Sequence, residues 1–401
     1  MKPAAYPAVY SKAAVAAVVT ANIGVIMAAF APVTNLLPHV LAKEKSGDGA
    51  SLAPLAAVTG TGAAVALLTN LLVGWLSDRL AQRLRGRRPW IVAGVVLGTA
   101  ALLILSTEES RVPALALTWA TAQAGFNLVI APLAAFVPEA VPRRRRGHVS
   151  ALLGVGQIAG VVLAAAVSAW RPGTPRHGFL VVAIFYLLLT APAVTVRSRP
   201  APDTAVDSHH RPRGTYADFG YAWLSRFAMT LAGAVAIVFL FPYLRDVLRL
   251  RDPDSAQFQV VLLTAVLVAV TAVVGGRASD HSGRRKPLLV ISVLVLATAQ
   301  LILALAPHWA ATLAAAVLIG IGYGAFLSVD QALITEVLPD VHRHARDLAV
   351  MNVAATAPQM CAPALAAFFT SGHGGYVGLY VTGSLLSLAA AVCVRAVRGI
   401  A

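Results

Sequence analysis

The sequence predicts an all-α integral membrane protein with twelve transmembrane helices in two pseudo-symmetric six-helix halves. The 401-residue chain is 58% hydrophobic and only 12% charged, with a mean hydropathy of +0.75, whereas soluble domains carry about a quarter charged residues. Uncharged stretches of about 20 residues recur, the length that a helix needs to cross a bilayer. Motifs of the first half also return in the second. Together these observations exclude a soluble enzyme, a disordered chain, a disulfide-rich secreted domain and an outer-membrane barrel.

The chain carries twelve apolar stretches that hydropathy predicts to be transmembrane helices. They cover residues 13–37, 52–76, 90–106, 113–138, 148–169, 177–196, 218–244, 256–277, 287–306, 309–338, 348–370 and 376–395. We interpret the first stretch as an uncleaved helix rather than a signal peptide, because a whole set of spans follows it. The long polar interruption between the sixth and seventh stretches predicts a solvated linker. We therefore expect an N-terminal half at 1–196, a cytoplasmic linker at 197–217 and a C-terminal half at 218–401.

Lysine and arginine predict the orientation, since cytoplasmic loops carry an excess of both. With both termini in the cytoplasm, 23 of the 32 basic residues fall on the cytoplasmic side, while acidic residues show little bias. The net charge of +15 is therefore a topology signal and requires no nucleic acid partner. Frequent alanine and arginine are typical of a GC-rich bacterial genome. We expect a multi-pass protein of the bacterial cytoplasmic (inner) membrane.

Two motif pairs relate the halves. GWLSDR at 74–79 and GRRP at 86–89 follow the second span, and GGRASD at 275–280 and GRRKP at 283–287 follow the eighth. Glu139 begins EAVP at the end of the fourth span, and Glu336 begins EVLP at the end of the tenth. Duplicated halves related by an axis along the membrane normal are a transporter architecture, in which substrate binds near the midplane.

These motifs carry a family resemblance that covers all twelve spans. The GxxSDR stretch that leads into GRRP between spans 2 and 3, echoed between spans 8 and 9, resembles the signature of the major facilitator superfamily. With Trp90 after GRRP, and with the run from Asp330 to Asp340, the chain is similar to the branch of sucrose transporters and glycoside–pentoside–hexuronide cation symporters. The resemblance implies the major facilitator fold and secondary active transport by alternating access. The second span has no carboxylate before Asp78, which disfavours sodium coupling through that span.

The repeated motif predicts a cytoplasmic gate. Asp78 would face the N-terminus of the eleventh span near Arg346, where the helix dipole favours a carboxylate, and Asp280 would face the fifth span near Gly147. The alternative is a positive-inside loop with an aspartate at a helix end. The glutamates at the cytoplasmic ends of the fourth and tenth spans either join this gate or are solvated. The expected gate residues are Gly74, Asp78, Arg79, Arg88, Glu139, Gly275, Asp280, Arg284 and Glu336.

Neutral polar side chains in the central spans are candidates for substrate binding. The resemblance implies that spans 1, 4, 7 and 10 line the cavity, and their mid-span polar residues are Asn22, Gln123, Asn127 and Tyr323. Such donors and acceptors suit sugar hydroxyls or another polar neutral solute. Interhelical hydrogen bonds, worth about 0.6 kcal/mol each, are the alternative for any one of them.

Arg226 and Asp330 are the full charges that we place within the hydrocarbon. At 1.5 Å per residue, Arg226 lies about 10 Å and Asp330 about 13 Å from the cytoplasmic ends of spans 7 and 10. Similar depth makes a pair feasible, and pairing offsets much of an insertion cost of roughly 2.5–3.5 kcal/mol per charge. A purely structural pair is one interpretation. The other is coupling, in which Asp330 takes a proton and Arg226 is released to engage substrate.

The sequence therefore favours a proton-coupled transporter, working as a monomer, that moves a small polar organic solute such as a sugar or glycoside. The alternative is a proton-driven exporter of a drug or secondary metabolite on the same fold. No catalytic constellation, metal-ligand spacing or cofactor motif is present in the sequence, so we expect no enzyme activity, metal or cofactor. The expected partners are the substrate, protons and the lipid bilayer.

Overall fold

The computed structural model describes most of the chain as helices. The described residues are 11–42, 53–80, 87–107, 111–134, 136, 140–170, 174–196, 215–282, 285–337, 350–351 and 353–397. Within these ranges, twelve helical segments are long and apolar enough to cross a membrane. They correspond in order to the twelve predicted spans, so the all-α, twelve-span class is confirmed.

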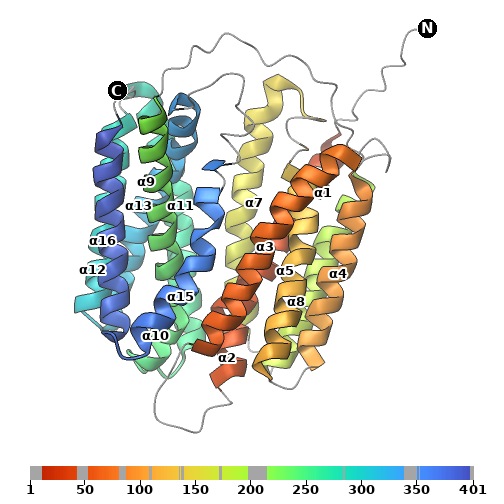
Figure 1. The fold of residues 1–401 in the computed structure, drawn as a ribbon, viewed down its shortest axis with the longest axis horizontal. Coiled ribbons are helices and arrows are strands. Elements are labelled where there is room, and N and C mark those ends of the chain that lie inside the picture. The colour runs from red at the N-terminus through yellow and green to blue at the C-terminus, as the bar shows by residue number, and fades with distance from the viewer. Residues whose placement is uncertain are drawn as a thin grey trace. The chain divides into compact units, whose positions relative to one another are not determined.

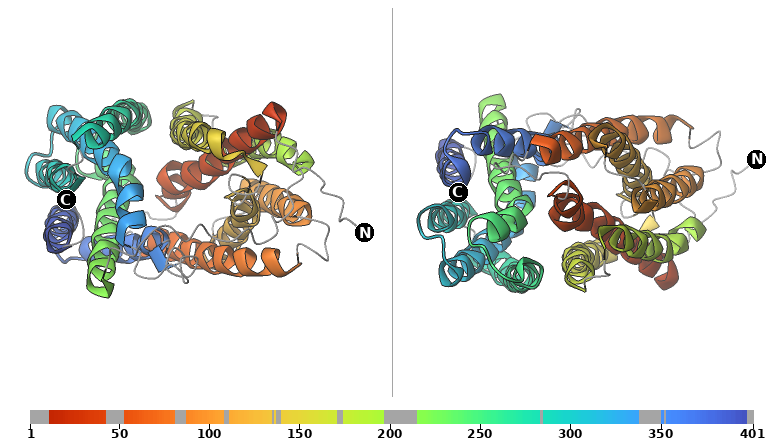
Figure 2. Two further views of the ribbon diagram at one scale, coloured as in Figure 1. Left: turned by 90° about the horizontal axis from the view of Figure 1, so that it is seen from above. Right: turned by 90° about the horizontal axis from the view of Figure 1, so that it is seen from below.

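The chain divides into two compact units. The N-terminal unit comprises residues 1–44 and 61–204, and the C-terminal unit comprises residues 45–60 and 205–401, so the division falls within helix α3. The predicted half and linker boundaries at 196 and 217 stay predictions. Each unit is a bundle of long helices, seen from the side in Figure 1 and along the helices in Figure 2.

The first half of the chain contains the following elements: α1 (Lys12–Ala31), the π-helical turn η1 (Pro32–Leu36), α2 (Leu37–Ala42), α3 (Ala53–Leu80), α4 (Arg88–Thr107), α5 (Val112–Ala134), α7 (Arg143–Ala169), α8 (Pro175–Thr190) and the 3₁₀ turn η2 (Ala191–Thr195). The second half contains α9 (Tyr216–Val238), α10 (Leu240–Asp246), α11 (Pro253–Ser282), α12 (Arg285–Leu305), α13 (Trp309–Val337), α15 (Pro358–Thr370) and α16 (Gly375–Ala396).

Glycines bring α4 and α5 of the N-terminal unit close together. A Cβ added to Gly125 would lie 2.5 Å from the backbone nitrogen of Gly98, so only glycine allows this approach. The Tyr186 hydroxyl of α8 donates a hydrogen bond of 3.1 Å to the Gly94 carbonyl. Close backbone approach through small residues is how membrane helices gain packing energy, because lipid supplies no hydrophobic drive between helices.

In the C-terminal unit, α13 is packed tightly between α11 and α12. Added Cβ atoms on Gly320 and Gly324 would collide with α11, at Leu267 and Thr271 respectively, and one on Gly322 would lie 2.7 Å from the Ser292 carbonyl oxygen of α12. Helix α9 packs mainly against α16 and α15 instead. Its contact with α13 is much sparser, so α13 belongs structurally with α11 and α12.

Local sequence defines several helix starts. The side chain of Ser11 caps α1, and Thr174 caps α8 just before Pro175. Thr215 and Asp218 form a reciprocal capping box at the start of α9, in which each side chain accepts a hydrogen bond from the other residue's backbone N–H. This arrangement satisfies donors that a helix N-terminus otherwise leaves unpaired.

The seventh span differs from the continuous helix predicted over 218–244. Helix α9 ends at Val238, Phe239 leaves helical geometry, and α10 starts at Leu240. Pro242 explains the break, because it has no N–H for the Val238 carbonyl and its ring crowds that carbonyl. The sequence therefore contained the signal for this interruption, and the prediction of one continuous helix was wrong.

Candidate functional site

Arg226 and Asp330 form an ion pair inside the C-terminal unit. Arg226 Nη1 of α9 lies 2.8 Å from Asp330 Oδ2 of α13, and the side chains are 11% and 5% exposed. The pairing predicted from their depths is therefore present. A single charge at this depth would be costly, whereas a buried pair retains only a partial penalty.

The ion pair leaves hydrogen-bonding capacity unused. Among the described residues, Arg226 Nη1 has no hydrogen bond of good geometry despite its closeness to the carboxylate, so its contact with Asp330 is one between charges. The neighbouring Ser225 hydroxyl is buried and also has no partner among those residues. Since buried polar groups normally find partners, these two atoms are suited to form hydrogen bonds with a bound ligand.

Tyr323 lies along the same boundary between α9 and α13. It precedes Asp330 by seven residues on α13, which places both on one face of the helix. A Cβ added to Gly233, seven residues after Arg226 on α9, would lie 3.5 Å from the Tyr323 ring. Two contacts two turns apart thus join the helices: Arg226 with Asp330, and Gly233 with Tyr323.

The candidate substrate-binding residues of the N-terminal unit differ in whether their side chains already form hydrogen bonds within the protein. Asn127 accepts a hydrogen bond of 3.2 Å from Asn70 and donates one of 2.9 Å to the Gln123 carbonyl, so both ends of its amide are engaged. The Asn22 side-chain oxygen is buried and has no partner within the described residues. Gln123 is half-buried beside Gly62 of α3.

The predicted gate residues that the structure describes lie at or near helix ends. Gly74, Asp78 and Arg79 fall in the last two turns of α3, Asp280 in the last turn of α11, and Glu336 near the end of α13. Arg88 is the exposed first residue of α4. Glu139 and Arg284 lie outside the described residues. Gly275 is buried on α11, and a Cβ added to it would lie 2.9 Å from the Ser328 hydroxyl of α13, so the two helices approach closely there.

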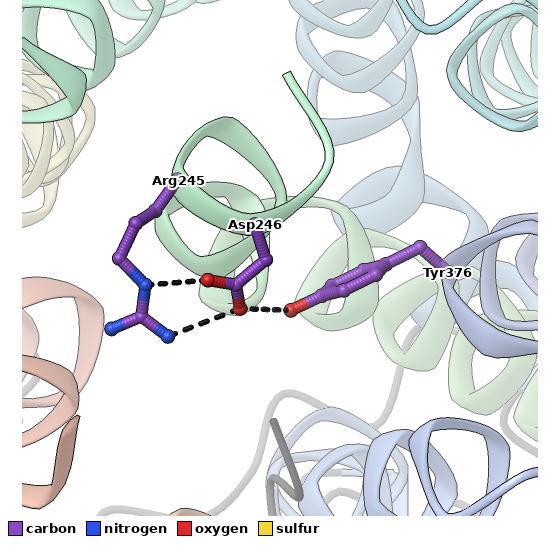
Figure 3. A network of polar contacts seen from close by, with 3 residues as sticks. All are labelled: Arg245, Asp246 and Tyr376. Carbon is purple, nitrogen blue, oxygen red and sulfur yellow. Dashed lines mark hydrogen bonds and ion pairs between the residues drawn. The ribbon is translucent and has the colours of Figure 1, made fainter. Parts of the chain in front are cut away.

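The structure contains a polar network at the end of α10 that was not predicted from the sequence. Arg245 donates through Nε and Nη2 to Asp246, at 2.6 and 3.0 Å, and the Tyr376 hydroxyl donates to the same carboxylate at 3.2 Å. Figure 3 shows the carboxylate between its two partners. The hydrogen bond to Asp246 is the main cause that raises the pKa of Arg245 above its ordinary value.

Comparison with known proteins decides the family. Residues 13–251 and 222–399 match the model of the Major Facilitator Superfamily. The chain belongs to the major facilitator superfamily. As a major facilitator it is a secondary transporter of a small molecule and not an enzyme. The sequence resemblance is thereby confirmed at the level of the superfamily.

Solved structures of two other transporters share this fold. A bacterial homologue of the human lysosomal transporter Spinster, inward-facing and occupied, gives a TM-score of 0.69 at 16% identity, covering 96% of this chain and 93% of that one. A mutant of the peptide transporter POT gives 0.74 at 13% identity, covering 95% and 93%. At such low identity these structures show the fold alone. A sequence comparison with curated proteins gave no match.

Proposed function

We propose that this major facilitator is a proton-coupled symporter of a small polar organic solute, such as a sugar or glycoside. The observation that carries the proposal is the buried ion pair of Arg226 and Asp330. Ionisable residues inside membrane segments are costly and mark substrate or proton pathways. A carboxylate that can be neutralised by a proton, next to an arginine with unused donors, provides both functions in one place.

In the proposed cycle, the Asp330 carboxylate and the solute compete for Arg226. When the site is open to the side with more protons, Asp330 takes a proton and its attraction for Arg226 falls. Arg226 and the unpartnered Ser225 hydroxyl can then hydrogen-bond an oxygen of the solute. Release of the proton from Asp330 on the other side restores the ion pair and displaces the solute. Proton and solute are thereby coupled, because Arg226 binds either the Asp330 carboxylate or the solute and not both at once.

The solute class follows from the neutral polar groups. Tyr323, Asn22 and Gln123 supply donors and acceptors without net charge, which suits hydroxyl-bearing solutes. Asn127 already uses its amide between helices, so we assign it to packing rather than to binding. The similarity of the motifs to sucrose and glycoside carriers supports the same class. We further propose the bacterial cytoplasmic membrane as the location, with both termini cytoplasmic.

The proposal is tested by transport into proteoliposomes with an inward proton gradient. A binding screen of sugars and glycosides, with amphipathic drugs as the comparison set, first identifies a solute. Asp330→Asn should then abolish accumulation and retain solute exchange, and Arg226→Ala should impair both. Asp246→Asn is the matched control, since it also removes an aspartate paired with an arginine in this unit and should leave coupling intact.

Two outcomes would contradict the proposal. If Asp330→Asn accumulates solute at the native rate, Asp330 does not carry coupling. If the inward proton gradient drives solute out of the vesicles, the protein is an exporter and the direction is wrong.

A further inference from the structure

Trp223 connects α9 to the start of the eleventh span. Its indole N–H donates a hydrogen bond of 2.9 Å to the backbone carbonyl of Val350. Val350 lies at the first described position of that span, ahead of α15. The indole also stacks on Phe227 of α9, with ring centroids 5.3 Å apart and planes 16° from parallel. The hydrogen bond and the stacking together fix the orientation of the ring.

The two contacts of α9 come from a single turn of the helix. Trp223 and Arg226 are three residues apart and therefore neighbours on the helix surface. One reaches the start of the eleventh span and the other reaches Asp330 near the end of α13. Helix α9 thus contacts two consecutive spans of the C-terminal unit, the tenth near its end and the eleventh at its start.

The boundary between α9 and α13 is sparsely packed. Glycines lock α13 against α11 and α12, while α9 packs chiefly on α16 and α15. The charged and titratable side chains that we find along this boundary are Arg226, Asp330 and Tyr323. When the ion pair opens, few other contacts hold α9 to α13, so α9 can shift against α13 while it stays packed on α16 and α15. Any such motion acts on Val350 through Trp223.

We propose that Trp223 is a positioning residue that transmits the protonation state of Asp330 to the start of the eleventh span. This inference rests on the proposed proton coupling through Asp330. Trp223 touches neither proton nor solute. It converts the release of Arg226 into a displacement of Val350, at the end of the span that the charge bias places in the cytoplasm.

The first test is the substitution Trp223→Phe, which removes the N–H donor and keeps an aromatic ring to stack on Phe227. Solute exchange without a gradient should stay native, while gradient-driven accumulation should fall about threefold to tenfold, the range expected for losing one hydrogen bond. Trp170→Phe is the matched control, because Trp170 lies exposed at the end of α7. If accumulation and exchange fall in parallel, or neither changes, Trp223 does not transmit coupling.

The second test reads the Trp223 environment directly in the full-length protein. After labelling with 5-fluorotryptophan, the ¹⁹F resonance of Trp223 is the signal missing from the Trp223→Phe sample. Acidification should shift this resonance in the native protein and leave it unchanged in Asp330→Asn. If Asp330→Asn loses accumulation but keeps the native acid shift, or if the native protein shows no shift, the transmission is wrong and proton coupling stands. If Asp330→Asn retains accumulation, the proposed function itself fails.

Discussion

The ring of Tyr323 on α13 packs directly over Gly233 on α9, two helical turns from the ion pair of Arg226 and Asp330. The absence of a side chain at Gly233 leaves room for the ring at this boundary. Both contacts run along the same helix pair with the same spacing on each helix. Tyr323, which we propose to bind solute, and the proposed proton-coupling pair therefore lie along one helix boundary of the C-terminal unit.

Substitutions of different size at Gly233 should show whether solute binding depends on the position of the Tyr323 ring. Gly233→Ala should be close to native, because its Cβ would lie at ordinary van der Waals distance from the Tyr323 ring. Gly233→Leu should push the ring away and cost about 1–3 kcal/mol of stability, the usual penalty for overpacking. Solute affinity by titration and thermal stability in detergent measure both effects. Equal affinity of the two variants would show that the position of Tyr323 does not matter for binding.

A double-mutant cycle should reveal strong coupling between Arg226 and Asp330. Removing one partner leaves a buried charge unpaired, which costs on the order of 3–5 kcal/mol. Arg226→Met and Asp330→Leu should therefore each lower thermal stability markedly, while the double variant should recover much of the loss. Strictly additive losses, measured by unfolding in detergent, would mean that the two charges do not stabilise each other.

Tyr376→Phe should weaken the connection between α10 and α16. The variant loses the hydrogen bond from the hydroxyl to Asp246 and keeps the ring, so we expect a loss of about 0.5–1.5 kcal/mol. Because the hydrogen bond to Asp246 raises the pKa of Arg245 above its ordinary value, the contribution of this arginine is complete throughout the neutral range and is lost only in strong alkali. The loss should therefore be the same from pH 6 to pH 9. A loss confined to one end of that range would show that another group controls the network.

Membrane topology can be checked with fusions at two loop positions. A reporter after Arg213 should be cytoplasmic, and one at Lys43 should lie outside, because the basic residues concentrate on the side of the termini. Cytoplasmic activity of the Lys43 fusion together with external exposure of the Arg213 fusion would reverse the orientation.

The sequence predicted the parts of this structure that depend on polarity along the chain. Arg226 and Asp330 stand out because charges in apolar stretches are rare, and helix rise gives their depth without any knowledge of packing. The partner of Asn127 could not be predicted in the same way. Whether it faces a cavity or Asn70 depends on the rotation of α5 about its axis, which hydropathy does not define.

Other features were hidden in residues of ordinary appearance. Trp223 is one aromatic residue near a helix end, where aromatics are common in membrane proteins. Its contact with the backbone of Val350 joins positions far apart in sequence, and a carbonyl partner has no sequence signature. The break at Phe239 is different, because Pro242 indicates it in the sequence. Hydropathy averaged over a window of residues does not detect such a break.

The most direct measurement of the central claim is proton movement caused by the solute alone. Proteoliposomes are prepared without a gradient, the identified solute is added outside, and external pH is recorded with a weakly buffered indicator. The account predicts that native protein makes the outside more alkaline as solute enters, and that Asp330→Asn moves solute without a pH change. Solute entry through the native protein with no external alkalinisation would contradict proton coupling by the pair of Arg226 and Asp330.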